Sequence, residues 1–170
     1  GVRVHLEERG SGIRKALEAD HVLLTVGRRP LTDGLGLDAL GLAPDDNGFL
    51  AVDGAQRTAL AHVFAIGDVA GQPMLAHKAS KEGEVAAEVI AGQPSAFDAR
   101  AMPAVVFTDP EIATVGLSAK DAKAQGFEVK VGKFAFAANG RALSLNETDG
   151  FVRIVVDAQT RSEERRVGKE

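Results

Sequence analysis

Residues 62–69 read HVFAIGDV and residues 72–79 read QPMLAHKA, and these two stretches decide the fold. The first is a short apolar run, prone to β structure, that ends in a Gly-Asp turn signal, so it predicts a buried strand. Gly67 has no side chain where a ligand's approach must be closest. Asp68 follows at the carboxyl end of the strand, where open α/β sheets bind their ligands. Its carboxylate only accepts hydrogen bonds, which suits the hydroxyl groups of a ribose or ribityl chain.

The second stretch predicts a helix. Pro73 is expected in the first turn, where its missing N–H costs nothing, and Gly92 followed by Pro94 predicts the end. The backbone N–H groups around residues 74–77, together with the helix dipole, are expected to stabilise negative charge, such as that on the pyrimidine edge of a reduced flavin ring. Apolar or small residues at helical spacing mark the face expected to be buried, namely Leu75, Ala79, Gly83, Ala86 and Ile90.

Residues 65–69 (AIGDV), 74–79 (MLAHKA) and 82–83 (EG) resemble the second FAD-contacting segment of the pyridine nucleotide–disulfide oxidoreductases, in the form found in lipoamide dehydrogenases. The resemblance implies that Asp68 binds the ribityl chain of FAD and that the backbone of residues 74–77 lies near the isoalloxazine ring. It assigns no catalytic residue and no metal ligand to this chain. The cofactor-binding residues that it implies are Gly27, Gly67, Asp68, Met74, Leu75, Ala76 and His77.

Two strand patterns precede this region. Residues 2–7 alternate between apolar and polar side chains and predict a half-buried strand, and residues 13–17 can return as its neighbour after a glycine-rich turn. Residues 19–27 are more densely apolar, which predicts a parallel strand buried on both faces. In the resembled family this segment closes the NAD domain, so the resemblance implies that the backbone of Gly27 lies near NAD.

The stretch GLGLDALG at residues 34–41 is similar to a dinucleotide-binding loop, but its third glycine is misplaced and no strand leads into the first, so that interpretation is rejected. A short strand is expected at residues 49–52. The leucines of this region are expected to anchor a short irregular helix, and they are Leu35, Leu37, Leu40 and Leu42.

The C-terminal part predicts an α+β domain. Ser118, with an acid three residues later, is expected to cap a helix that ends at Gly126. Residues 103–116 and 139–142 resemble the dimerisation domain of the same family, which implies a homodimer. Strands are expected at residues 104–108, 112–116, 127–136 and 151–157.

The predicted fold class is therefore α/β and α+β: the end of an NAD-binding Rossmann-like domain (1–29), the second half of an FAD-binding domain (30–102) and the first part of a dimerisation domain (103–160). Residues 161–170, RSEERRVGKE, break the pattern abruptly. They resemble the conceptual translation of a sequencing adapter, and we expect them to be a non-native tail.

Composition limits the possible functions. The 170 residues carry a net charge of −4, which argues against a nucleic-acid surface. There is no signal-peptide pattern and no apolar run long enough to span a membrane. The chain contains no cysteine, which excludes disulfide frameworks and cysteine-ligated metals within it. Because it opens on a strand pattern without Met, we expect a fragment.

The resemblance runs through residues 2–160 in the family's order. It implies a dimeric, cytoplasmic flavoenzyme that oxidises dihydrolipoamide with NAD+ through an enzyme disulfide and FAD, and that serves a 2-oxo acid dehydrogenase complex with lipoyl domains. The redox cysteine pair and the catalytic His–Glu pair are expected outside this chain. The chain by itself is therefore expected to be inactive and to bind FAD poorly, because half-domains bury too little surface.

Alternatives remain open. Another FAD/NAD(P) disulfide reductase or a soluble transhydrogenase of the same family would share the Gly-Asp segment. A magnesium-dependent phosphotransferase would use Asp68 as a metal ligand, but it needs further carboxylates, and no second Asp follows in this loop. A non-catalytic dimerisation module could be formed by the chain from residue 103 onward.

Overall fold

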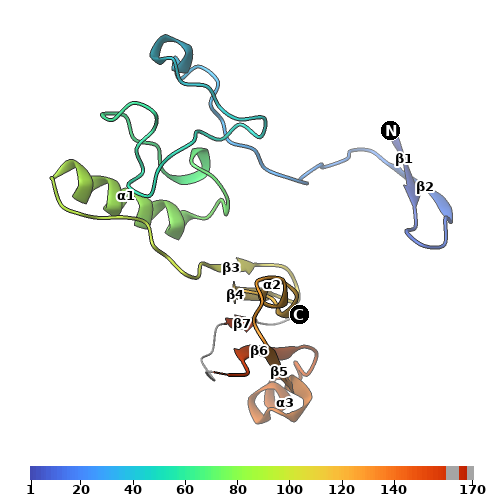
Figure 1. Ribbon diagram of the computed structural model, residues 1–170. Coiled ribbons are helices and arrows are strands. Elements are labelled where there is room, and N and C mark those ends of the chain that lie inside the picture. The colour runs from blue at the N-terminus through green and yellow to red at the C-terminus, as the bar shows by residue number, and fades with distance from the viewer. Residues whose placement is uncertain (160–164, 168–170) are drawn as a thin grey trace. The chain divides into compact units, whose positions relative to one another are not determined.

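The computed structural model describes residues 1–159 and 165–167. The chain divides into two compact units, Gly1–Pro30 and Leu31–Glu170 (Figure 1). Of the residues predicted to be a non-native tail, only the backbone of Arg165–Val167 is described, and the others lie outside the described residues.

The first unit is a β-hairpin followed by an irregular segment. Strands β1 (Val2–Glu7) and β2 (Arg14–Ala19) pair antiparallel, with Val4 opposite Leu17. The predicted strand pair is therefore confirmed. The Glu8 N–H donates to the Ile13 carbonyl at 2.9 Å and closes the turn between the strands.

The prediction of a strand buried on both faces at residues 19–27 is wrong. After β2 ends at Ala19, residues 21–30 form neither helix nor strand, and Leu23, Leu24 and Val26 are 87%, 79% and 81% exposed. A strand of this kind needs hydrogen-bonding neighbours on both sides. Within this unit, β1 and β2 pair with each other and leave the segment without a ladder.

The second unit begins with a largely irregular region around one long helix. The 3₁₀ helix η1 (Leu37–Leu40) confirms the short irregular helix, but of its predicted anchors only Leu42 is buried. The strand expected at residues 49–52 is absent from the described chain, although Leu50 is buried and its N–H donates to the Val69 carbonyl at 2.8 Å.

The predicted strand at residues 62–66 is reduced to a single bridge. Arg57 pairs with Phe64, and the Ala65 N–H donates to the Gln56 carbonyl at 3.1 Å. Gln56 has a φ of 65°, a left-handed conformation that no strand uses. The partner segment therefore leaves the ladder after one bridge, and the prediction of a regular strand here is wrong.

Helix α1 (Ala76–Ile90) confirms the predicted helix, and Gly92, with φ 81°, follows its C-terminus as expected. Leu75 is the N-cap, so Pro73 precedes the helix and does not lie in its first turn as predicted. The buried face is also rotated from the predicted one, because Ile90 is 67% exposed. The buried helix residues are Lys78, Glu82, Val85, Ala86 and Val89.

The C-terminal part forms an antiparallel five-stranded sheet, which confirms the α+β prediction for this region. Val155 in the sheet is fully buried. In spatial order the strands are β3 (Pro103–Val106), β4 (Ile112–Gly116), β7 (Arg165–Val167), β6 (Phe151–Asp157) and β5 (Val129–Ala135).

Two short helices accompany this sheet. In α2 (Ala119–Ala124) the Ser118 hydroxyl accepts from the Asp121 N–H at 3.2 Å, which confirms the predicted cap. The 3₁₀ helix η3 (Phe136–Ala138) leads into α3 (Gly140–Leu145), which is capped by the Asn139 side chain. Among the described helices, none has the length and apolarity needed to cross a bilayer.

Candidate functional site

The Gly-Asp turn packs directly against helix α1. Gly67 opens the 3₁₀ helix η2 (Gly67–Val69) with a φ of 76°, and it is buried. A Cβ atom on Gly67 would lie 3.2 Å from the Cβ of Ala79 on α1. Glycine is thus required here by the left-handed backbone and by the close approach of α1. This is a reason within the chain itself, in addition to the ligand approach expected from the sequence.

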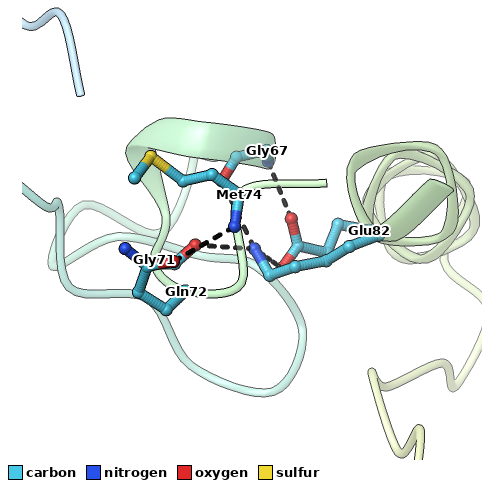
Figure 2. Close-up of polar contacts among 6 residues, drawn as sticks. Gly67, Gly71, Gln72, Met74 and Glu82 are labelled. Carbon is cyan, nitrogen blue, oxygen red and sulfur yellow. Dashed lines mark hydrogen bonds and ion pairs between the residues drawn. The ribbon is translucent and has the colours of Figure 1, made fainter. Parts of the chain in front are cut away.

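A buried ion pair on α1 fastens the helix to this turn. The Lys78 Nζ lies 2.7 Å from the Glu82 Oε1, and both side chains are 5% exposed. The other carboxylate oxygen of Glu82 accepts from the Gly67 N–H at 2.7 Å. The Lys78 ammonium also donates to the Gly67 carbonyl at 3.3 Å and to the Gly71 carbonyl at 3.1 Å (Figure 2). Both charges are therefore fully paired inside the protein.

Sequence reasoning missed this pair, although the sequence carries a signal for it. Lys78, Glu82, Val85 and Val89 recur at spacings of four, three and four, which is one helical face. Opposite charges four residues apart can pair on a helix. A helical pattern that includes charged as well as apolar residues places Lys78 and Glu82 on the same face as the buried valines.

Asp68 lies in the middle of η2 and is exposed. Among the described residues, none donates a hydrogen bond to its carboxylate. The backbone on either side of Asp68 is fixed, since Gly67 is bound by Lys78 and Glu82 and the Ala70 N–H donates to the Gly67 carbonyl at 3.0 Å. The turn therefore presents a carboxylate whose acceptor capacity is available to a ligand.

The amino end of α1 has no side-chain cap. Leu75 is extended and offers no side-chain oxygen, so the first N–H groups of the helix have no intrahelical acceptor. The Met74 N–H donates to the Gln72 side chain at 3.2 Å (Figure 2). The His77 ring is engaged elsewhere, with its Nε2 2.8 Å from the Pro103 carbonyl oxygen. What this helix end offers a ligand is therefore mainly backbone N–H groups and the positive end of the helix dipole.

The packing of η2 against α1 brings most of the predicted site residues together: Gly67, Asp68 and residues 74–77 all belong to these two elements or to the turn between them. Gly27 lies in the other unit, exposed and with a φ of 80°. No group of three or more potential metal ligands occurs among the described residues, so the carboxylate cluster that a magnesium enzyme needs is not found there.

Of two hollows in the second unit, one lies beside the candidate site and the other lies away from it. One of about 410 Å³ is lined in part by Ala70 and Gly71, and one of about 780 Å³ by residues 108–111 and 146–149. Neither is lined by Asp68 or by residues 74–77. The candidate site is thus defined by its chemistry and its fixed backbone, and not by either of these hollows.

Comparisons with known proteins identify the family of the chain. Residues 1–83 match the model described as pyridine nucleotide-disulphide oxidoreductase, and residues 102–162 match the model of the dimerisation domain of the same family. The dihydrolipoyl dehydrogenase of Halobacterium salinarum is 60% identical over 149 residues, which cover 88% of this chain and 31% of the relative. That of Geobacillus stearothermophilus is 55% identical over 156 residues, which cover 92% of this chain and 33% of the relative. The chain thus spans about a third of the length of these relatives.

Solved structures show the same fold. LpdA from Mycobacterium tuberculosis aligns with a TM-score of 0.80 at 30% identity, covering 94% of this chain and 35% of that one. The HOCl-induced flavoprotein disulfide reductase RclA from Escherichia coli aligns with a TM-score of 0.82 at 24% identity, covering 97% and 38%, and shows the fold alone. With two models of one family matched in order along most of its length, the chain belongs to the pyridine nucleotide–disulfide oxidoreductases.

Proposed function

We propose that this chain belongs to an FAD-dependent dihydrolipoyl dehydrogenase, which oxidises dihydrolipoamide with NAD+ through an enzyme disulfide. One observation carries the proposal: η2 is held against α1, so that an exposed carboxylate and an uncapped helix amino end belong to one packed unit. The identity of 60% and 55% to two dihydrolipoyl dehydrogenases supports this activity over others in the family.

Each predicted site residue then has a role. Asp68 accepts hydrogen bonds from hydroxyl groups of the ribityl chain, which a carboxylate without protein donors is able to do. The backbone N–H groups of Ala76 and His77 stabilise negative charge on the flavin ring, while Met74 and Leu75 lie beside it. Gly67 keeps the turn close to the helix. In the other unit, the backbone of Gly27 contacts NAD.

The bound flavin would carry electrons between the dithiol–disulfide chemistry and the nicotinamide. The residues of this chain hold and orient it, and they supply neither the redox cysteines nor a proton-transferring base. His77 is not assigned as that base, because its ring already lies within hydrogen-bonding distance of the Pro103 carbonyl.

The proposal includes a domain arrangement and partners. Residues 1–29 end the NAD-binding domain, residues 30–102 contribute to the FAD-binding domain and residues 103–160 to a dimerisation domain that forms a homodimer. The enzyme would serve a 2-oxo acid dehydrogenase complex with lipoyl domains in the cytoplasm. We also propose that residues 161–170 are non-native. Resequencing the locus across residue 160 tests this proposal. A continuous gene that encodes RSEERRVGKE would contradict it.

The test uses the full-length product of the gene that encodes this chain. Dihydrolipoamide-dependent reduction of NAD+ by a flavin-containing dimer is the expected result. Exclusive activity with another disulfide and NADPH, or hydride exchange between the two nicotinamide nucleotides without a dithiol, would instead indicate a different reductase or a transhydrogenase. A purified product without flavin would overturn the proposal as a whole.

A further inference from the structure

We propose that Lys78 and Glu82 are positioning residues of the flavin site. The buried pair fixes the turn of residues 67–71 against α1, and thereby sets where the Asp68 carboxylate lies relative to the amino end of that helix. This inference rests on the proposed function, in which both features contact one flavin.

The contacts of Lys78 show how the turn is held. An ammonium group has three N–H donors, and here three acceptors surround it: the Glu82 carboxylate at 2.7 Å, the Gly71 carbonyl at 3.1 Å and the Gly67 carbonyl at 3.3 Å. The two carbonyls belong to the first and last residues of the turn. One buried charge on α1 therefore ties both ends of the turn to the helix.

Glu82 completes the attachment as a hydrogen-bond acceptor, whereas Lys78 acts as a donor. One oxygen binds Lys78, and the other accepts from the Gly67 N–H at 2.7 Å. Lys78 and Glu82 thus bind the carbonyl and the N–H of the same glycine. Gly67 immediately precedes Asp68, so the orientation of its peptide groups determines the direction in which the Asp68 side chain leaves the turn.

Stability alone gives a poor reason for this arrangement. Removing two charges from water is costly, and well-packed apolar side chains often stabilise a protein as well as a buried ion pair does. The same face of α1 carries Val85 and Val89, both buried, so apolar side chains at positions 78 and 82 would also have apolar neighbours to pack against. An apolar pair could not bind the peptide groups of Gly67 and Gly71. A fully satisfied polar network fixes one geometry, which is what a ligand site requires.

The experiment uses the flavin-containing full-length protein and two single variants, Lys78→Met and Glu82→Gln. The matched controls are Lys81→Met and Glu84→Gln, because this second pair on the same helix is exposed (51% and 63%), with the Lys81 Nζ 3.1 Å from Glu84. Loss of hydrogen bonds to a charged group predicts an FAD dissociation constant raised about tenfold or more in Lys78→Met and Glu82→Gln. The controls are expected to bind FAD like the wild type.

A second readout separates positioning from general stability. The visible circular dichroism of bound flavin is expected to change in the two test variants and to stay the same in the controls, because it reports the geometry around the ring. Variants that melt at lower temperature but keep the wild-type FAD affinity and flavin spectrum would overturn the inference. The Lys78–Glu82 pair would then only stabilise the fold.

Amide hydrogen exchange of residues 67–71 in the flavin-free protein tests, without the cofactor, whether Lys78 and Glu82 hold the turn. If Lys78→Met does not fold, the measurement is made on Glu82→Gln, which is the milder change. Faster exchange in the variant supports the inference, and unchanged exchange overturns it. If Asp68→Asn binds FAD like the wild type, the proposed role of Asp68 fails, and the exchange result still decides whether the pair holds the turn.

Discussion

At Gly67, two independent constraints act on one residue. Its φ of 76° is unfavourable for any residue with a Cβ, and that Cβ would also lie 3.2 Å from the Cβ of Ala79. Gly92, just beyond the same helix, has a similar φ of 81° but open space around it. The two glycines therefore separate the cost of the backbone conformation from the cost of close packing.

We expect Gly67→Ala to destabilise the full-length protein more than Gly92→Ala. Gly92→Ala should cost about 1–2 kcal/mol, the penalty of a left-handed conformation, and Gly67→Ala should add a further cost from contact with Ala79. Chemical denaturation of both variants measures this difference. Equal losses would mean that α1 moves away from the turn without cost.

Asp68 is exposed and accepts no hydrogen bond from the described residues, so we expect its substitution to affect ligand binding and not folding. Asp68→Asn keeps the shape but weakens acceptance from ribityl hydroxyls, and a loss of about tenfold in FAD affinity is expected for hydrogen bonds to a charged group. Flavin titration measures the expected loss of FAD affinity, and thermal melting checks that the stability of the fold is unchanged. Asp38→Asn is the matched control, because Asp38 lies in the first turn of η1 as Asp68 does in η2. A similar loss of affinity in the control would contradict a specific role for Asp68.

Helix α1 carries two Lys–Glu pairs that differ in burial. Lys78→Met leaves the buried Glu82 without its cation, for which we expect a loss of about 3–5 kcal/mol in unfolding free energy. Lys81→Met removes an exposed partner and should change stability little. Urea denaturation of the two variants at neutral pH measures the contrast, and similar losses would show that burial is not the deciding factor.

The exposed pair also has a defined pH dependence. The hydrogen bond that Lys81 donates to the Glu84 carboxylate, followed by the negative charge of Glu84, Glu88 and Asp98, raises the pKa of Lys81 above its usual value of 10.5. The small stabilisation by Lys81 is therefore fully present below pH 10.5, and it disappears as the pH rises through the raised pKa of the folded state. Denaturation of wild type and Lys81→Met at increasing pH should show their difference closing only in that alkaline range. If the difference in stability between the two proteins disappears near neutral pH, a titrating group other than Lys81 is responsible for it.

The elements that sequence reasoning predicted correctly share a physical property. Strand pairs β1–β2, β3–β4 and β5–β6 find their antiparallel neighbours nearby in the chain, so local alternation and turns are enough to identify them. The apolar runs at residues 19–27 and 62–66 predict β character equally well, but a ladder needs a partner, and periodicity does not reveal whether one is present. The apolar pattern predicts the wrong buried face of α1 for another reason, because two of the buried residues, Lys78 and Glu82, are charged.

The sequence predicts which elements form the candidate site but not how these elements are held together. The motif around Gly67 and Asp68 indicated a ligand-binding turn beside a helix start, and the structure packs these elements together. The motif included Lys78 and Glu82 without indicating what they bind. Their partners are backbone groups of a turn up to fifteen residues away, and such contacts are set by tertiary packing, which a single sequence does not display.

At the scale of the whole molecule, the 170-residue chain exposes large apolar side chains, with Leu23 and Phe107 more than 80% exposed. We expect this chain, expressed alone, to show no dihydrolipoamide oxidation and to bind FAD weakly, because part of a cofactor site leaves most of the ligand in water and exposed apolar surface favours aggregation. Flavin titration and sedimentation of the purified chain are the measurements. Tight, stoichiometric flavin binding would contradict this expectation.

The contact between the His77 ring and the Pro103 carbonyl joins two residues that are twenty-six positions apart in the sequence and closes the chain between them into a loop. The irregular stretch between α1 and β3 therefore bridges two anchored points instead of setting their separation, and Phe97 within it is also anchored, because its N–H donates to the Gly54 carbonyl at 2.7 Å. Since doubling the length of such a bridge costs only about 0.6 kcal/mol in closure entropy, it is a natural place to insert a reporter peptide or affinity tag without disturbing the elements at its ends.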